Sequence, residues 1–138
     1  MGDKLSADEL LFRQVHPEFY QNGVLGSRAF KPNSSDKGQM STDRAALVSA
    51  EDAFNHYTQH VKKKSACVYG LTVGAFEAVA IECRADPLEA DGDIPPNPAH
   101  SLADYTGTPE KSWKILSQRL RDVAEAGGCK HPAAPAAA

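Results

Sequence analysis

The chain lacks the features that would place it at once in a specialised class of protein. Only three of its 138 residues are cysteine, and only 7% are aromatic. No apolar run approaches the roughly 20 residues that a membrane-spanning helix needs. The net charge of −3 gives no general attraction to nucleic-acid phosphates or to anionic lipid. We therefore expect neither a membrane nor a nucleic acid as a partner.

The cysteines Cys67, Cys83 and Cys129 are odd in number and include no Cys-x-x-Cys pair. This pattern indicates reduced thiols rather than a disulfide framework, because small secreted domains use paired cysteines. The first nine residues also contain no apolar run of the kind found in a signal peptide. The sequence therefore predicts a cytoplasmic protein.

The overall composition is typical of one globular domain. Hydrophobic residues make up 41% of the chain and charged residues 24%, which is ordinary for a soluble fold. A chain of this length buries roughly two-thirds of its surface and can form a core without a cross-link. We predict an N-terminal extension at 1–9, a globular domain at 10–127 and a disordered Ala/Pro-rich tail at 128–138.

Two amphipathic helices are the clearest predicted elements. The first begins near Ser49, a suitable N-cap, and ends at the lysines of 62–64. The second begins at Thr-Pro (108–109), with proline at the first helical position, and ends at Gly-Gly (127–128). Its predicted buried stripe contains Trp113, Leu116, Leu120 and Val123.

Shorter elements fill the rest of the domain. Apolar and β-branched runs predict strands or extended segments, and runs rich in Pro, Asn, Asp and Gly predict loops. The extended segments are 10–16, 24–30, 66–73 and 100–105 (the last as an edge strand), a short helix is 75–83, and the loops are 31–43 and 86–98. The irregular alternation predicts an α+β single domain whose small mixed β-sheet is packed by two main amphipathic helices.

The histidines and cysteines do not suggest a metal centre. His56 and His60 have the helical spacing that lets two imidazoles share a metal ion. No third ligand follows at a fixed spacing, so we interpret them as surface or boundary histidines. Cys129 and His131 lie in the predicted tail, where ordering a site would cost about 1–2 kcal/mol per residue. We predict no metal and no cofactor.

The acidic run Glu89–Asp93 resembles part of a calcium-binding loop but fails a test of register. With Gly92 at the glycine position of an EF-hand, Pro87 and Pro98 occupy the first and last positions. Both positions need carboxylates. The run is therefore a solvated acidic loop or a contact surface for a basic partner.

The main candidate for chemistry combines Arg13, His16, Ser27 and Asp36. An arginine on one strand and a serine on the next extended segment could bind a phosphorylated or carboxylated ligand. The guanidinium would make a bidentate contact and the hydroxyl a further hydrogen bond. In the alternative interpretation, these polar groups only satisfy the backbone of a turn-rich segment.

Two motifs resemble those of a small bacterial protein family. They are Leu-Leu-Phe-Arg-Gln-Val-His-Pro at 10–17 and Ser-Arg-Ala-Phe-Lys-Pro at 27–32. The similarity continues through 53–58 and 68–73. It implies one family for most of the domain but no particular activity.

Arg13 and Ser27 also resemble the first two elements of ADP-ribosyltransferase-like folds, including the RES-type NAD-degrading toxins. Those folds begin with a strand bearing an arginine and place a serine on a later strand. Their third element, a glutamate on a later strand, has no clear counterpart here, because Glu77 and Glu82 fall in the predicted short helix. The resemblance implies a small NAD- or nucleotide-handling enzyme.

Two functions follow as hypotheses. The leading one is a small bacterial accessory protein that binds another protein, such as an antitoxin, immunity or defence component. It rests on size, acidity, the acidic loop and the absence of a Gly-rich phosphate loop or a Gly-x-Ser-x-Gly elbow. The alternative is the nucleotide-handling enzyme. An open pocket that gathers the candidate residues would favour the enzyme.

Overall fold

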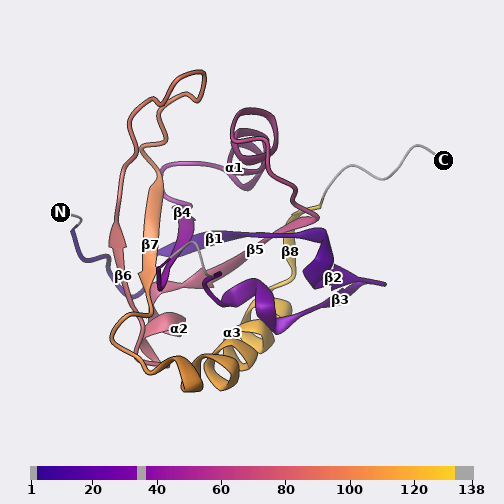
Figure 1. Cartoon of the computed structure of the whole chain (residues 1–138), viewed down its shortest axis with the longest axis vertical. Coiled ribbons are helices and arrows are strands. Elements are labelled where there is room, and N and C mark those ends of the chain that lie inside the picture. Colours follow the sequence, from indigo (N-terminus) through magenta and orange to yellow (C-terminus); the bar gives the residue numbers. More distant parts are fainter. Residues whose placement is uncertain (1–2, 34–36, 133–138) are drawn as a thin grey trace.

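A six-stranded sheet forms the centre of the molecule (Figure 1). The computed structural model describes residues 3–33 and 37–132. The sheet order is β6 (Glu82–Ala85), β7 (His100–Asp104), β4 (Gln39–Arg44), β1 (Leu10–Val15), β5 (Cys67–Thr72) and β8 (Cys129–Pro132). The predicted α+β class is confirmed. The sheet is antiparallel rather than mixed, because each described strand runs opposite to its neighbours.

Helices cover both faces of the sheet. In Figure 1, α1 (Ala50–Asn55) lies above it, whereas α2 (Val73–Glu77) and α3 (Trp113–Gly127) lie below it. Ser49 caps α1 as predicted, and a π-helical turn at His56–His60 continues the helix. None of the helices in the described ranges is long and apolar enough to cross a bilayer.

Alternate residues of β1 divide the core into two clusters. Leu11 and Val15 belong to the larger cluster, which includes Leu120 of α3. Phe12 belongs to the smaller cluster with Ala53 of α1. Because successive side chains of a strand point to opposite faces, β1 contributes to both clusters and is buried from both sides.

The buried stripe of α3 differs by one position from the prediction. Leu116 and Leu120 are buried as expected, and Ala124 continues the stripe four residues later. Val123 is 52% exposed instead. Each helical residue turns by about 100°, so position 124 rather than 123 stays over the sheet.

A small hairpin lies beside the main sheet. It pairs β2 (Tyr20–Gln21) with β3 (Val24–Leu25). Its turn residues Asn22 and Gly23 have φ of 56° and 75°, as a two-residue hairpin turn requires. The Asn-Gly pair thus reverses the chain between two strands.

Three predicted segments need correction. The extended segment 24–30 holds only β3, since a 3₁₀ helix occupies Ser27–Phe30. The loop 31–43 ends early, because β4 begins at Gln39. The segment 100–105 does form a strand, β7, but it lies between β6 and β4 and is not an edge. The last two corrections share a cause, because β4 and β7 pair with each other although they are far apart in the sequence.

The predicted helix 75–83 is also shorter than expected. α2 ends at Glu77, and Ala80 has a φ of 65°, which a helix cannot continue through. The chain then enters β6, which pairs with β7. Cys83 therefore lies in a strand, not in a helix.

Both ends of the described chain belong to the folded domain. Leu5 is buried in the larger cluster, and the Glu9 carboxylate accepts from the Arg44 guanidinium at 2.5 Å. At the other end, Cys129–Pro132 forms β8. The structure thus moves both predicted domain boundaries outward. Residues 133–138 of the predicted tail lie outside the described residues.

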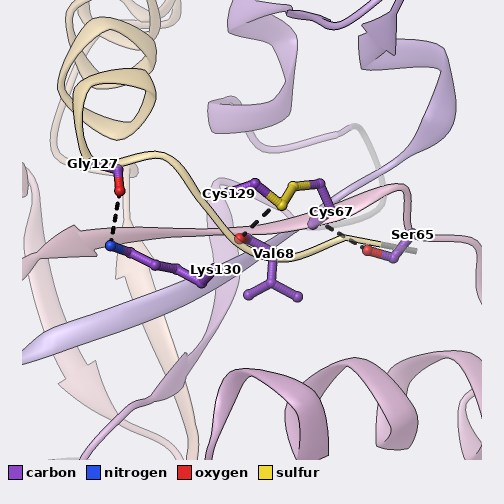
Figure 2. Close-up of a disulfide and its surroundings, with 6 residues drawn as sticks. All are labelled: Ser65, Cys67, Val68, Gly127, Cys129 and Lys130. Atoms are coloured by element: carbon purple, nitrogen blue, oxygen red, sulfur yellow. Dashed lines mark hydrogen bonds between the residues drawn. A yellow bond between two sulfur atoms is a disulfide. The ribbon is translucent and has the colours of Figure 1, made fainter. Parts of the chain in front are cut away.

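A disulfide joins Cys67 of β5 to Cys129 of β8 (Figure 2). Their Cα atoms are 6.1 Å apart although 62 residues separate them in sequence. The prediction of reduced cysteines is therefore wrong for this pair, and only the sheet brings the two together.

Cys83 is a free, buried thiol, and burial raises its pKa to about 12. Disulfides persist mainly in oxidising compartments. The cysteines therefore no longer support the predicted cytoplasmic location.

Candidate functional site

The predicted site residues that the structure describes do not line a common cavity. Arg13 lines the two cavities described below, whereas His16 and Ser27 line neither. His16 instead caps a short 3₁₀ turn, where its Nδ1 accepts a hydrogen bond from the Glu18 N–H at 3.0 Å. Ser27 begins the next 3₁₀ helix. Asp36 lies outside the described residues.

Arg13 is held in place by backbone carbonyls from two other segments. Its Nε donates to the Ala29 carbonyl at 2.8 Å, and its Nη1 donates to the Ser41 carbonyl at 3.0 Å. These bonds connect β1 to the Ser27–Phe30 helix and to β4. They orient the guanidinium and leave its positive charge close to both cavities.

The larger cavity, which we call the basic pocket, has a volume of about 650 Å³. Among residues 3–33 and 37–132, four cationic side chains and one carboxylate surround it. Its lining residues are Arg13, Phe19, Arg28, Lys31, Pro32, Asn33, Lys37, Gly38, Glu110 and Trp113. In a chain of net charge −3, this concentration of cations creates a local positive field.

Two aromatic rings form walls of the basic pocket. The Arg28 guanidinium lies over the Phe19 ring, 5.0 Å from its centroid. Trp113 packs edge-on against Tyr105 at 5.7 Å, and its indole N–H donates to the Thr108 carbonyl at 3.0 Å. The indole is therefore fixed in position and presents a rigid apolar surface to the pocket.

Tyr105 supports this pocket from the core. Its hydroxyl donates to the Phe30 carbonyl at 2.5 Å, and its backbone N–H donates to the Gly38 carbonyl at 2.7 Å. Burial raises the pKa of the Tyr105 phenol, so it stays a proton donor. These bonds join Tyr105, which directly follows β7, to the segments that carry Arg28, Lys31 and Lys37.

The smaller cavity, which we call the polar pocket, has a volume of about 160 Å³ and lies on the α1 side of the sheet. Polar side chains from four segments line it together with apolar ones. The lining residues are Phe12, Arg13, Gln14, Ser41, Thr42, Asp43, His56, Tyr57, Val61, Lys63, Leu88, Asn97 and His100.

The polar pocket contains a buried carboxyl group and a buried amide. Burial raises the pKa of Asp43, although a 2.9 Å hydrogen bond from Asn97 opposes the change. Gln14 is 8% exposed, and neither its amide nitrogen nor its amide oxygen has a hydrogen-bond partner among the described residues. Burying an amide without hydrogen-bond partners destabilises the fold by about 1–3 kcal/mol. A ligand or water that forms hydrogen bonds with Gln14 in this pocket would offset that free energy.

The two histidines with metal-ligand spacing have other contacts. The rings of His56 and His60 are 5.8 Å apart, and His56 Nε2 lies 3.3 Å from the Pro95 carbonyl. Within residues 3–33 and 37–132, no group of three or more His, Cys, Asp or Glu side chains could hold a metal ion.

Comparison with protein-family models, with curated proteins and with solved structures found no match to this chain. The two resemblances described above therefore stay predictions from the motifs. The functional interpretation rests on the pockets themselves.

Sequence reasoning found Arg13 but missed the set of residues around it. Arg28 lies in the Ser27–Phe30 helix and Lys31 directly follows it. No local pattern in the sequence marked these two cations as part of one pocket. Trp113 was assigned to the core stripe, and nothing local connects it with Lys37.

Proposed function

We propose that the protein binds a phosphorylated small molecule with an aromatic ring, such as a nucleotide, in the basic pocket. The observation that carries this proposal is the placement of Arg13, Arg28, Lys31 and Lys37 around one cavity with Trp113. The proposed ligand class, a nucleotide, is the same as in the alternative hypothesis of a nucleotide-handling enzyme. It assigns Arg13 to the ligand and gives no role to His16 or Ser27.

Charge favours an anion at this site. Guanidinium and ammonium groups form charge-assisted hydrogen bonds with phosphate oxygens. Among the described lining residues, Glu110 is the one carboxylate, so the four cations outnumber it and a phosphate would balance their excess. Arg13 cannot leave the pocket easily, because two carbonyls hold it.

Size and shape favour a ligand with a ring. A volume of about 650 Å³ lies within the range of roughly 300–1,000 Å³ that small-molecule sites have. Trp113 lines the pocket, and stacking on an aromatic ring stabilises a base by about 1–3 kcal/mol. Simple inorganic phosphate would use the cations but not the Trp113 ring.

Trp113 also provides the assay, because it is the only tryptophan in the chain. We expect ADP to change its fluorescence in a saturable, salt-sensitive manner, with tighter binding than either adenosine or inorganic phosphate. Arg28→Ala and Lys31→Ala should each weaken ADP binding by about tenfold or more. Lys114→Ala is the matched control, because Lys114 lies on α3 but outside the lining.

Two results would contradict the proposal. One is the absence of any response to ADP at low salt, with isothermal calorimetry also showing no heat of binding. The other is equal binding by Arg28→Ala, Lys31→Ala and Lys114→Ala, which would mean that the ligand does not use the basic pocket.

An accessory role through protein binding, as an antitoxin, immunity or defence component, is the second proposal. It is supported by the exposure of Glu89, Asp91 and Asp93 together with Leu88, which is 45% exposed. A partner on this loop would carry a basic patch beside an apolar one. A pull-down should lose that partner when all three acidic residues are changed to lysine. Equal recovery with the native chain and the variant would refute the use of this loop.

A further inference from the structure

Three side chains form a hydrogen-bonded row across neighbouring strands at the polar pocket. The Ser41 hydroxyl lies 3.1 Å from His100 Nε2. On the other side of the ring, His100 Nδ1 lies 3.0 Å from a carboxylate oxygen of Asp86. A serine, a histidine and an aspartate connected in this order have the geometry of a catalytic triad, which is defined by geometry and not by chain order.

The hydrogen bonds determine the tautomer of His100. Its Nδ1 lies 3.0 Å from the Asp86 backbone carbonyl as well as from the carboxylate. Both of these oxygens can only accept, so Nδ1 carries the proton. Nε2 is then the lone-pair acceptor and takes the hydrogen bond from Ser41. This is the arrangement that a general base for a serine nucleophile needs.

The antiparallel register brings the three residues together. Asp43 pairs with His100, so Ser41, two residues away on the same face of β4, is the diagonal neighbour of His100. Asp86 directly follows β6, and its backbone N–H donates to the His100 carbonyl at 2.9 Å. Strands β4, β7 and β6 are consecutive in the sheet, so the row crosses β4 and β7 and ends at the residue that follows β6.

The polar pocket gives a substrate access to the Ser41 hydroxyl and places a hydrogen-bond donor nearby. Ser41 is exposed at its edge, and His100 is 11% exposed in its side chain, so a substrate can reach the hydroxyl while the ring stays sheltered. Gln14, lining the same pocket, has a buried amide N–H group without a partner among the described residues. An unpaired buried donor is the kind of group that stabilises an oxyanion.

We propose that Ser41 is a nucleophile, His100 its general base and Asp86 the residue that positions His100, for hydrolysis of a small carboxylic ester. The acyl group must be short, because a volume of about 160 Å³ is below the roughly 300–1,000 Å³ of sites for larger ligands. Phe12 and Leu88 give the pocket apolar walls. This activity uses a different cavity from the basic pocket and does not depend on the function proposed above.

Each step of the hydrolysis balances with water as the second reactant. Ser41 Oγ forms a bond to the carbonyl carbon as its proton moves to His100 Nε2. His100 then protonates the departing alkoxide as the carbon–oxygen bond to the alcohol breaks. Water adds to the acyl carbon with His100 again taking the proton, the bond to Oγ breaks, and Ser41 regains a proton as the carboxylic acid leaves.

The test uses a fluorophosphonate reagent on the full chain. Serine nucleophiles displace its fluoride and keep the phosphonyl group, which intact-mass and peptide-mapping measurements detect. We expect one adduct, on Ser41, and slow turnover of p-nitrophenyl acetate. Ser41→Ala should abolish the adduct, and His100→Gln should slow its formation by about 100-fold or more. Ser27→Ala is the control, since Ser27 is not part of the row.

Asp86 acts through His100, so its test needs a readout beyond activity. Asp86→Asn should slow labelling by about tenfold, less than His100→Gln, because the Asp86 backbone carbonyl still accepts from Nδ1. Asp86→Glu should restore part of the rate. In ¹⁵N NMR of the native chain, His100 should show a protonated Nδ1 and an unprotonated Nε2.

Several outcomes would overturn the proposal. They are no adduct on the native chain, an adduct on any serine other than Ser41, or a labelling rate unchanged in His100→Gln. The first two need no variant, so a folding defect cannot obscure them. ADP binding by Ser41→Ala should equal that of the native chain, which separates this result from the test of the basic pocket.

Discussion

Reduction of the Cys67–Cys129 disulfide should destabilise the protein strongly. The bond closes a loop of 62 residues, and loop-closure entropy for that length corresponds to about 4 kcal/mol at 25 °C. Domains of ordinary stability unfold with about 5–15 kcal/mol, so the loss is a large part of the total. With a urea m-value of about 2 kcal/mol per molar, the midpoint should fall by about 2 M, measured by Trp113 fluorescence.

A thiol count checks the premise of this prediction first. In denaturant without reductant, the chain should show one reactive thiol, from Cys83, and after reduction three. Cys83→Ala is the matched control, because it keeps the disulfide and should show the same fall on reduction. Three thiols before reduction, or an unchanged urea midpoint after it, would refute the reasoning.

Three further perturbations follow from buried contacts. Tyr105→Phe leaves the Phe30 carbonyl without its hydroxyl donor and should cost about 1–3 kcal/mol in urea unfolding; an unchanged midpoint would contradict this. Asp43→Asn should raise stability at pH 7, because burial raises the pKa of Asp43 in the folded state. The native chain therefore loses stability as pH rises from the unfolded value of 3.8 through the folded pKa, and the variant should lose this dependence. Gly38→Ala should cost about 1–3 kcal/mol, because Gly38 has a φ of 81° and an added Cβ would lie 2.9 Å from the Thr106 methyl carbon. A thermal scan of that variant matching the native chain would refute it.

Strong local signals explain the elements that sequence analysis predicted well. The strand at 10–16, the strand at 66–73 and the helix ending at Gly127-Gly128 all follow from apolar runs, caps and stop signals within a few residues. The short 3₁₀ helix at Ser27–Phe30 has no such signal. Its contacts are with distant groups, as in the bond from Arg13 to the Ala29 carbonyl.

The candidate sites were harder to predict than the elements. Arg13 was found because the predicted strand at 10–16 carries an arginine next to turn-rich polar segments. Ser41, Asp86 and His100 lie up to 59 residues apart, and no motif of fixed spacing connects them. Ser41 was assigned to a loop, so its pairing with β7 could not be considered.

Composition and local pattern alone determined the class of the fold, the two principal helices and the central strands, because these depend on burial periodicity and on residues close in sequence. The order of the strands, the antiparallel register, the disulfide and both pockets were decided only in the tertiary structure. The physical reason is distance along the chain. A side chain's immediate neighbours limit its conformation, but its hydrogen-bond partners and the charges around it come from segments that only folding brings within reach.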